Sequence, residues 1–375
     1  MEPVELTEGG VRLRMFLPDD APAVAEACGD PITQRFIPDL PRPYTVVDAL
    51  HWITKGSTAA WAGGGAAWAI ADPGSDELLG CVGLSRAVPE RAQIEVGYWI
   101  TPRARGKGAA TAATIAATGH AVRSGFGRVE LLTDAANAVS QRVALAAGFS
   151  YEGVRRGAAS QPGRLPTADR EDLVVWTRLA GDPPGPTPRT LPDLPGDGLT
   201  DGVVRLRPLG PADADFAYHL ESLPDVAATS VPPVVPTRAL IEAQCAKAPG
   251  RWLAGQRIDV VVCDAASGTP AGRIGLSYLS PELGEAMIGY SLLPQWRGRG
   301  YTARAVRLLA RWIFANTAVA RLAAGALPSN VASQRVLERA GFQREGRNRA
   351  QLPGADASRH DSVQYSLLPA DLDKA

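Results

Sequence analysis

The sequence has 375 residues, 39 basic against 39 acidic side chains, 45% apolar residues and 21% charged residues. This apolar content excludes wholesale disorder, and the length suggests two domains. Balanced charge gives no global attraction to nucleic acid, the apolar runs are too short for a membrane span, and the acidic N-terminus lacks the layout of a secretion signal. The four cysteines form no metal-type pair. We therefore expect a cytoplasmic protein with no metal and with neither nucleic acid nor membrane as a partner.

Hydrophobic periodicity in the first half of the chain predicts alternating strands and helices. We expect a strand at 11–16, helices at 21–28 and 47–55, and a meander of strands at 67–71, 78–86 and 93–100. A glycine-rich turn at 106–108 then opens an apolar helix at 109–124, followed by a strand at 129–133, a helix at 140–147 and a strand at 173–178. This order predicts an α/β (α+β) domain with a strand-to-helix crossover at its centre.

A proline- and glycine-rich segment follows at residues 181–199. Its prolines remove backbone donors and forbid a helix, so we interpret it as a semi-rigid, extended linker. The expected domains are residues 1–180 and 200–375.

The second half of the chain repeats the first. Val11-Arg12-Leu13-Arg14 recurs from Val204 and Asn137-x-x-Ser140 recurs from Asn330, both 193 positions later, and Gly97-Tyr98 recurs as Gly289-Tyr290, 192 positions later. An offset this constant indicates two homologous domains rather than a solenoid, whose period is far shorter. Each domain is expected to hold a mixed central sheet flanked by helices.

The most specific chemical signal is a glycine pair between a strand and a helix in each copy. It reads Arg103-x-x-Gly106-x-Gly108 in the first copy and Gln295-x-x-Gly298-x-Gly300 in the second. Because glycine has no Cβ, successive N–H groups can point into one concavity at the positive end of a helix dipole, which suits a pyrophosphate. Basic residues flank both turns at Arg105, Lys107, Arg297 and Arg299. The alternative is a helix start with glycines for close packing.

These motifs resemble the GNAT N-acetyltransferases, which use acyl-coenzyme A. Gly97-Tyr98-Trp99 before the glycine turn, and Asn137-x-x-Ser140-Gln141-Arg142 followed by Ala147-Gly148-Phe149-x-x-Glu152-Gly153, resemble the RimJ/RimL branch of protein N-terminal acetyltransferases more narrowly. The second copy repeats both motifs. The resemblance implies tandem GNAT-like domains, and acetyl-CoA or another acyl-CoA as co-substrate.

The resemblance also implies roles for individual residues. The pyrophosphate would be held around Arg103, Arg105, Gly106, Lys107, Gly108 and Ala109 in the first copy, and around Gln295, Arg297, Gly298, Arg299, Gly300 and Tyr301 in the second. Asn137 and Asn330 would bind the pantetheine arm, with a helix N-cap as the alternative. Ser140 and Ser333 would lie near the sulfur as proton donors, with a capping role as the alternative. The strand before each turn would splay from its neighbour and offer backbone N–H groups to the thioester.

The general base is where the sequence departs from the family pattern. The positions of the family tyrosine are Ala144 and Leu337, and Ala159 and Leu352 fall near the place of the RimL glutamate. The remaining carboxylates are Glu95 and Glu130 in the first copy and Glu285 in the second. Glu95 and Glu285 are the candidate bases, and the counterpart of Glu95 is Met287. A water relay or an amine that arrives neutral remain alternatives.

We interpret the chain as an N-acyltransferase that moves an acyl group from coenzyme A to a primary amine, by direct attack and without a protein nucleophile. A peptide or protein N-terminus is the acceptor that the resemblance favours. The alternatives are a small-molecule or antibiotic amine as acceptor, and a non-catalytic acyl-CoA sensor or scaffold. The sequence leaves open which copy is active.

Overall fold

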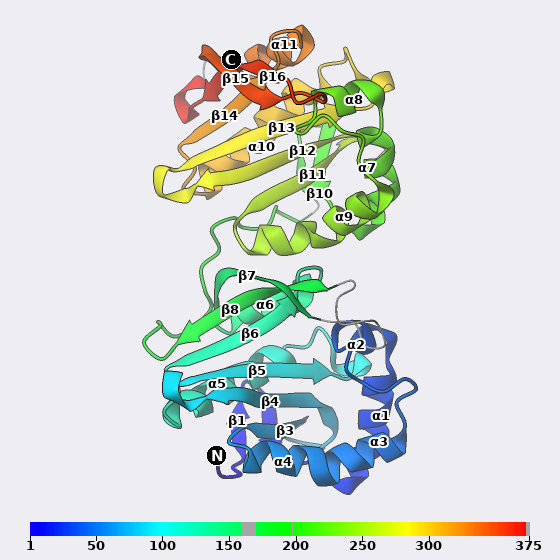
Figure 1. Ribbon diagram of the computed structural model, residues 1–375, viewed down its shortest axis with the longest axis vertical. Helices are drawn as coiled ribbons and strands as arrows, with labels where there is room; N and C mark the ends of the chain where they lie inside the picture. Colours follow the sequence, from blue (N-terminus) through cyan, green and yellow to red (C-terminus); the bar gives the residue numbers. More distant parts are fainter. Residues whose placement is uncertain (160–169, 197, 373–375) are drawn as a thin grey trace. The chain divides into compact units, whose positions relative to one another are not determined.

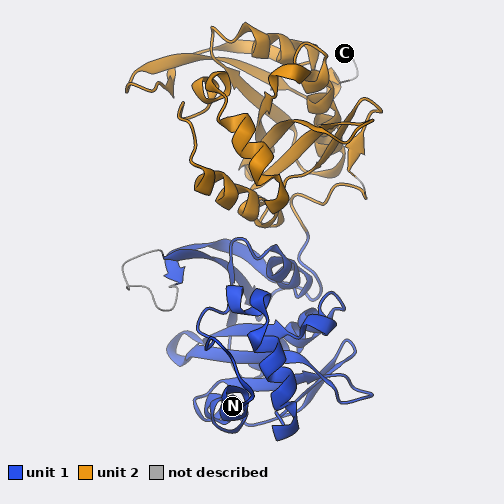
Figure 2. Cartoon of the chain, turned by 90° about the vertical axis from the view of Figure 1, so that its right-hand side faces the viewer, with its two compact units in different colours: residues 1–188 blue, residues 189–375 orange. Residues whose placement is uncertain are grey.

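A computed structural model describes residues 1–159, 170–196 and 198–372. The chain divides into two compact units, Met1–Pro188 and Arg189–Ala375 (Figure 2). The division falls inside the segment interpreted as a linker, of which residue 197 lies outside the described residues. Leu191 and Leu194 from this segment are buried in the core of the second unit, so the later half of the segment is part of that unit.

The described part of the first unit forms an eight-stranded sheet in the order β1-β2-β3-β4-β5-β6-β8-β7 (Figure 1). Strands β5 and β6 run parallel, and the other neighbouring pairs run antiparallel. The strands are β1 (Leu6–Glu8), β2 (Val11–Arg14), β3 (Ala66–Ala71), β4 (Leu78–Val88), β5 (Gln93–Ile100), β6 (Arg128–Asp134), β7 (Ser150–Ala159) and β8 (Glu171–Leu179).

Helices pack along the sheet of the first unit. They are α1 (Ala21–Gly29), α2 (Pro31–Phe36), α3 (Val46–His51), α4 (Ser57–Ala62), α5 (Ala109–Arg123) and α6 (Ala138–Ala146), with a π-helical turn at Trp52–Gly56. Helix α5 contacts β4 and β5, and α6 contacts β6. Ala69 of β3 packs in a separate cluster with residues of α1 and α3.

The second unit repeats this architecture, in the sheet order β15-β16-β14-β13-β12-β11-β10-β9 over its described residues, with β13 and β14 parallel. Its strands are β9 (Leu199–Thr200), β10 (Val204–Pro208), β11 (Arg257–Asp264), β12 (Pro270–Ser280), β13 (Glu285–Leu292), β14 (Arg321–Ala326), β15 (Gln343–Pro353) and β16 (Arg359–Leu367). Its helices are α7 (Ala214–Glu221), α8 (Pro224–Thr229), α9 (Arg238–Leu253), α10 (Tyr301–Asn316) and α11 (Val331–Arg339).

Side-chain alternation explains why helices cover both faces of this second sheet. Val260 and Val262 of β11 lie in the core that includes α10, whereas Val261 and Cys263 lie in the cluster that includes α7 and α9. A strand with apolar residues on both faces is stable where both faces are covered. Both units are therefore α+β domains with a mixed sheet between two helical layers, which confirms the predicted fold class.

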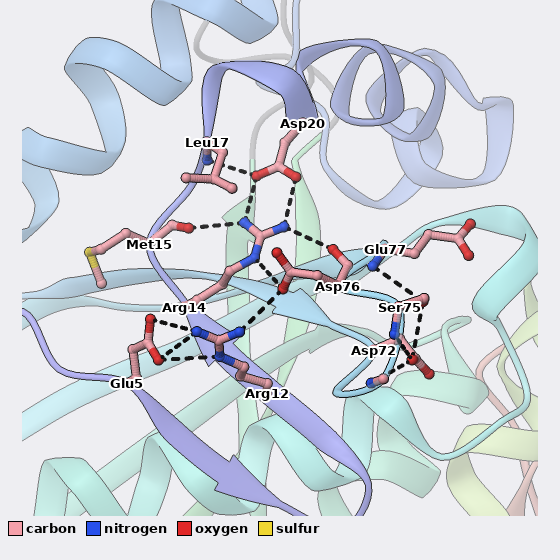
Figure 3. A network of polar contacts seen from close by, with 11 residues as sticks. Glu5, Arg12, Arg14, Met15, Leu17, Asp20, Asp72, Ser75, Asp76 and Glu77 are labelled. Atoms are coloured by element: carbon pink, nitrogen blue, oxygen red, sulfur yellow. Dashed lines mark hydrogen bonds and ion pairs between the residues drawn. The ribbon is translucent and has the colours of Figure 1, made fainter.

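A buried arginine ties the start of the first unit together (Figure 3). Arg14 of β2 donates to both carboxylate oxygens of Asp20, at 2.8 and 2.9 Å, and to Asp76 Oδ1 at 2.9 Å. Hydrogen bonding to Asp20 raises the pKa of Arg14, so its charge is permanent. In the second unit Arg207 makes the same pair with Asp213. This duplicated contact joins the second strand to the start of the first long helix.

The prediction missed elements with weak periodicity. Strand β1 and helix α2 are short, and β7 is an edge strand whose residues are mostly exposed. Edge strands carry polar and charged residues because one side faces solvent, so their sequence loses the apolar signal. The helix expected at 47–55 begins at Val46, and the helical segment continues through the π-turn to Ala62.

Candidate functional site

The parallel strands separate soon after they meet. In the described register β5 pairs with β6 through Gln93↔Arg128, Ile94↔Val129 and Glu95↔Glu130, and no pair follows. In the second unit the pairing of β13 with β14 ends in the same way at Met287↔Ala323. The last five residues of each first strand therefore border a gap in the sheet, as the resemblance led us to expect.

The backbone orientation shows which groups face this gap. Thr101 N–H donates to Leu79 O of β4 at 2.9 Å, and successive residues of a strand point to alternate edges. Tyr98 N–H therefore points away from β4, toward the side where the pairing with β6 has ended. Leu293 N–H donates to Ala271 O at 2.9 Å, which fixes Tyr290 N–H in the same orientation. Each gap thus has a backbone donor directed toward it.

The glycine turns lie at the ends of these strands. Gly106 and Gly108 have φ of 74° and 85°, and Gly298 and Gly300 have φ of 76° and 79°, which is the left-handed region that favours glycine. A Cβ added to any of the four would meet nothing within 4 Å, so the turns border open space. Gly108 and Gly300 are also the N-caps of α5 and α10.

The backbone donors of the turns are not used by the described residues. The helical hydrogen bonds begin only after the turns. The carbonyl oxygen of Gly108 accepts from Ala112 N–H, and the carbonyl oxygen of Gly300 accepts from Arg304 N–H. No described residue accepts from the N–H groups of 106–111 or of 298–303. Together with the glycine conformation and the helix dipole, these donors could bind a phosphate or pyrophosphate.

The flanking side chains divide into two groups. Arg103 pairs with Glu77 at 2.7 Å, Arg105 with Asp30 at 2.5 Å and Arg297 with Asp225 at 2.6 Å. Tyr301 is buried, and its hydroxyl donates to Asp264. Lys107, Gln295 and Arg299 are exposed, and Arg299 lies over the ring of Trp296 at 5.4 Å. The residues of the first group contact protein carboxylates, whereas those of the second face solvent.

The predicted asparagines cap helices. Asn137 Oδ1 accepts from Ser140 N–H at 3.1 Å and Asn330 Oδ1 accepts from Ser333 N–H at 3.0 Å. Both asparagines therefore act as helix N-caps, the alternative stated for them above. Their side-chain amide nitrogens remain available for a ligand. Gln141 and Gln334 donate to carbonyl oxygens of the preceding loop, which fixes that loop against the helix.

The predicted serines do not cap. Ser140 Oγ lies 2.8 Å from Tyr98 OH, and Ser333 Oγ lies 2.9 Å from Tyr290 OH. Burial raises the pKa of both tyrosines to about 12, against a smaller opposing effect of the serine contact. Each serine hydroxyl is thus bound to a tyrosine that keeps its proton at neutral pH.

The predicted carboxylates occupy different positions in the two units. Glu95 is the last residue of β5 paired with β6, opposite Glu130, and it binds Arg86 at 3.0 Å. Side-chain alternation places it on the same face as Gly97 and on the opposite face from Tyr98. Glu285 is the first residue of β13, before the gap, and binds Arg321 at 3.2 Å. The structure therefore places Glu95 at the gap and Glu285 at the far end of its strand.

The two units differ at the point where the strands part. In the first unit Glu130 is 3% exposed and accepts from Arg128 at 2.7 Å and from Arg155 at 2.5 Å. The residues at this point in the second unit are Met287, which is 38% exposed, and Ala323. One gap is thus lined by paired charges and the other by apolar side chains.

The duplicated geometry agrees with a family match. The model of the acetyltransferase (GNAT) domain matches residues 11–150 and again residues 204–343. The chain belongs to the GNAT acetyltransferase family. It contains two GNAT domains in tandem, which confirms the resemblance drawn from the sequence.

Individual GNAT relatives match shorter segments. The probable N-acetyltransferase YjcK of Bacillus subtilis is 44% identical over 61 residues, 16% of this chain and 34% of YjcK. The putative ribosomal N-acetyltransferase YdaF of Bacillus subtilis is 36% identical over 101 residues, 27% of this chain and 55% of YdaF. The matches thus span between a third and about half of these curated relatives. A solved structure of Mycobacterium smegmatis RimJ with CoA-disulfide is 20% identical, covering 47% of this chain and 86% of that one, with a TM-score of 0.42.

The sequence singles out Glu130 as a carboxylate of the first copy, but it predicts no site role for Tyr98, Tyr290, Asp30 or Asp225. The tyrosines had a signal, because Gly-Tyr recurs in both GNAT domains. The aspartates had none, because their pairing partners lie 75 and 72 positions away in the sequence. Ala144 and Leu337, at the expected place of the family tyrosine, are buried in the GNAT cores.

None of the helices within 1–159, 170–196 and 198–372 combines the length and the apolar composition needed to cross a bilayer. The same described ranges contain no cluster of three or more His, Cys, Asp or Glu side chains arranged to hold a metal ion.

Proposed function

We propose that this GNAT protein transfers an acyl group, most readily acetyl, from coenzyme A to a primary amine. The proposal rests on the pair of glycine turns. At each turn, backbone N–H groups at the start of a helix have no acceptor among the described residues, and the turn lies beside a gap in the sheet. A pyrophosphate held at the turn would allow a pantetheine arm to run into the gap. Coenzyme A would supply the acyl group as an activated thioester.

The residues around the gap have distinct tasks in this proposal. The N–H groups of 106–111 and of 298–303 bind the pyrophosphate, and the exposed Lys107 and Arg299 add positive charge. The amide nitrogens of Asn137 and Asn330 donate to the arm. Tyr98 N–H and Tyr290 N–H donate to the carbonyl oxygen on which negative charge develops, and such oriented donors are a large contribution to acyl transfer.

Attack by the amine requires no covalent enzyme species. A C–N bond forms while the C–S bond breaks, the nitrogen loses one proton, and the sulfur gains one. Glu95 is the first unit's candidate base, because it lies where the strands part, on the face that Gly97 leaves open. Holding both reactants in one gap supplies the rest of the rate enhancement through proximity.

The acceptor that we propose is the N-terminus of a peptide or protein. The support is the repeated Asn-x-x-Ser motif shared with the RimJ/RimL branch and the similarity to YdaF, which is named as a putative ribosomal N-acetyltransferase. Amine-bearing small molecules and antibiotics are the alternative acceptors to be tested beside it.

A second role fits the second unit. Met287 and Ala323 replace the carboxylates at the point where β13 and β14 part, and Glu285 lies before the gap. A unit with a complete glycine turn and no carboxylate at its gap fits acyl-CoA binding, with transfer there limited to an amine that arrives neutral.

The test is thiol release from acetyl-CoA by the full chain, against a panel of peptides with free N-termini, the same peptides with blocked N-termini, and small-molecule amines. We expect release with free N-termini and none with blocked ones. Tight coenzyme A binding in calorimetry without release on any amine would contradict catalysis and support a sensor. The absence of both binding and release would contradict the proposal as a whole.

A further inference from the structure

Two tyrosine hydroxyls make the same contact in both units. Tyr98 OH lies 2.8 Å from Ser140 Oγ and Tyr290 OH lies 2.9 Å from Ser333 Oγ. The paired residues are 42 positions apart in one unit and 43 in the other, so the contact depends on how the strand packs against the helix. It is present in both units although the neighbouring carboxylate is found in only the first of them.

The serine hydroxyls are available for this contact because another residue caps each helix. Asn137 and Asn330 accept the N–H groups of Ser140 and Ser333 through their own side chains. The hydroxyl of a serine in a first helical turn usually hydrogen-bonds to the nearby backbone. Here each hydroxyl instead contacts a tyrosine, on the side of the helix that faces the strand bordering the gap.

The tyrosine keeps a proton that it can donate to the serine. Tyr98 lies beyond the last pair between β5 and β6, and it is partly buried. A phenol whose pKa burial raises to about 12 does not lose its proton at neutral pH. When it donates to Ser140 Oγ, the serine's own proton is directed to a different acceptor, and such chains of hydrogen bonds strengthen one another.

We propose that Tyr98 and Tyr290 are positioning residues that orient the Ser140 and Ser333 hydroxyls toward the sulfur atom that departs within the gap. This inference rests on the proposed acyl transfer. The serine proton passes to the sulfur as the C–S bond breaks, and the serine oxygen regains a proton from solvent, which has received the one lost by the attacking nitrogen. One proton is lost and one is gained, so no further reactant is needed.

The second unit has a weaker form of this arrangement. Tyr290 OH also lies 3.1 Å from the carbonyl oxygen of Ser333, so its proton has two acceptors. When the Tyr290 hydroxyl donates to the Ser333 carbonyl oxygen, it does not orient the Ser333 hydroxyl. The loss of the tyrosine hydroxyl is therefore expected to have a smaller effect in the second unit.

The kinetic test isolates one unit at a time in the full chain. Tyr98→Phe, Ser140→Ala and the double variant are made with the second glycine turn blocked by Gly298→Glu, and Tyr290→Phe and Ser333→Ala with the first blocked by Gly106→Glu. Tyr98→Phe is expected to lower kcat about tenfold with KM for acetyl-CoA unchanged, the effect of one lost hydrogen bond. The double variant is expected to be no slower than Ser140→Ala alone, because the tyrosine acts through the serine. Additive losses would overturn the inference.

A binding measurement tests the same orientation without catalysis. Calorimetry compares coenzyme A with desulfo-coenzyme A, which lacks the sulfur. The parent chain is expected to prefer coenzyme A severalfold, and Tyr98→Phe and Ser140→Ala are expected to remove that preference. Unchanged preference in Tyr98→Phe would overturn the inference.

Tyr365→Phe is the matched control, because it also removes a tyrosine hydroxyl from a buried side chain. That hydroxyl lies 3.3 Å from Glu338 and not beside Ser140 or Ser333. It is expected to leave kcat and the sulfur preference as they are. A parent chain that neither binds coenzyme A nor releases thiol would contradict the proposed function itself. An active parent chain whose Phe variants match it would contradict this inference alone.

Discussion

Arg105 Nη2 lies 2.5 Å from Asp30 Oδ2, which joins the residue before the first glycine of the turn to the residue that caps helix α2. Arg297 and Asp225 make the corresponding pair in the second unit at 2.6 Å. The arginine that the sequence assigned to the pyrophosphate is thus bound to a protein carboxylate. The pair couples the proposed cofactor turn to the short helix after α1, and its charge can be tested by mutation.

Asp30→Asn removes the charge and keeps the cap, because asparagine caps helices as well as aspartate does. We expect the free energy of unfolding of the first unit to fall by about 1 kcal/mol, since both side chains are partly exposed. Coenzyme A binding is expected to tighten about threefold, because a negative charge has been removed near the turn. Urea unfolding and calorimetry measure the two effects. Weaker binding would show that the pair holds Arg105 in its binding orientation.

The same pair predicts a pH dependence. Burial by itself would raise the pKa of Asp30, but hydrogen bonds from Arg105 and from Thr33 N–H outweigh it and hold the pKa below the ordinary value of 3.8. A lowered folded-state pKa gives stability that is present above the unfolded value and is lost as the pH falls through the folded value. The stability advantage of the parent chain over Asp30→Asn should therefore be constant from pH 7 to pH 5 and shrink below about pH 3.8. An advantage as large at pH 2 as at pH 5 in urea unfolding would contradict this account.

Gly106→Glu and Gly298→Glu test which unit needs its turn. Each change puts a negative side chain into the open space above the turn, and we expect coenzyme A affinity of that unit to fall at least about tenfold through repulsion and blocked amides. Calorimetric stoichiometry and thiol release measure binding and activity separately.

The controls are Gly125→Glu in the first unit and Gly268→Glu in the second. Both glycines have positive φ and open surroundings, so the backbone cost is matched. Equal losses of binding in the control and turn variants would mean that strain, and not ligand contact, explains the effect.

Asn137 can be tested for a role beyond the cap. Asn137→Ala should lower the free energy of unfolding by about 1 kcal/mol, whereas Asn137→Ser retains a side-chain oxygen that caps and should be nearly neutral. Both variants lack the amide donor, so both should bind coenzyme A severalfold more weakly. If Asn137→Ser binds as the parent does, Asn137 is a helix cap only. Asn330 provides the same comparison in the second unit.

Glu95 and Glu285 are expected to differ. With the second turn blocked, Glu95→Gln should lower kcat about a hundredfold at neutral pH, the usual contribution of a general base, while KM for acetyl-CoA stays constant. With the first turn blocked, Glu285→Gln should change kcat less than about twofold, because Glu285 precedes the gap and binds Arg321. A normal rate in Glu95→Gln would favour a water relay or a neutral amine.

Several features of this protein could be predicted because they are local. Strand alternation, the apolar helix after the turn and the constant repeat offset each depend on neighbouring residues or on spacing, and all appear in the structure. The glycine turns were predicted for the same reason: a positive φ at Gly106 or Gly298 is a property of the backbone at that residue. The edge strands β7 and β15 carry no such signal, since solvent covers one side of them.

The contacts that make the site depend on packing between distant segments. Tyr98 reaches Ser140 because β5 and α6 lie beside each other, and Arg105 reaches Asp30 because α2 lies beside the turn. The end of the β5–β6 pairing at Glu95 likewise involves two strands that are separated in the sequence by the whole of α5. The sequence by itself determined two GNAT folds and two glycine turns, because local conformation and spacing encode them. Only the tertiary structure decided which side chains meet at each gap, because burial and hydrogen bonding between remote residues are settled when the layers pack.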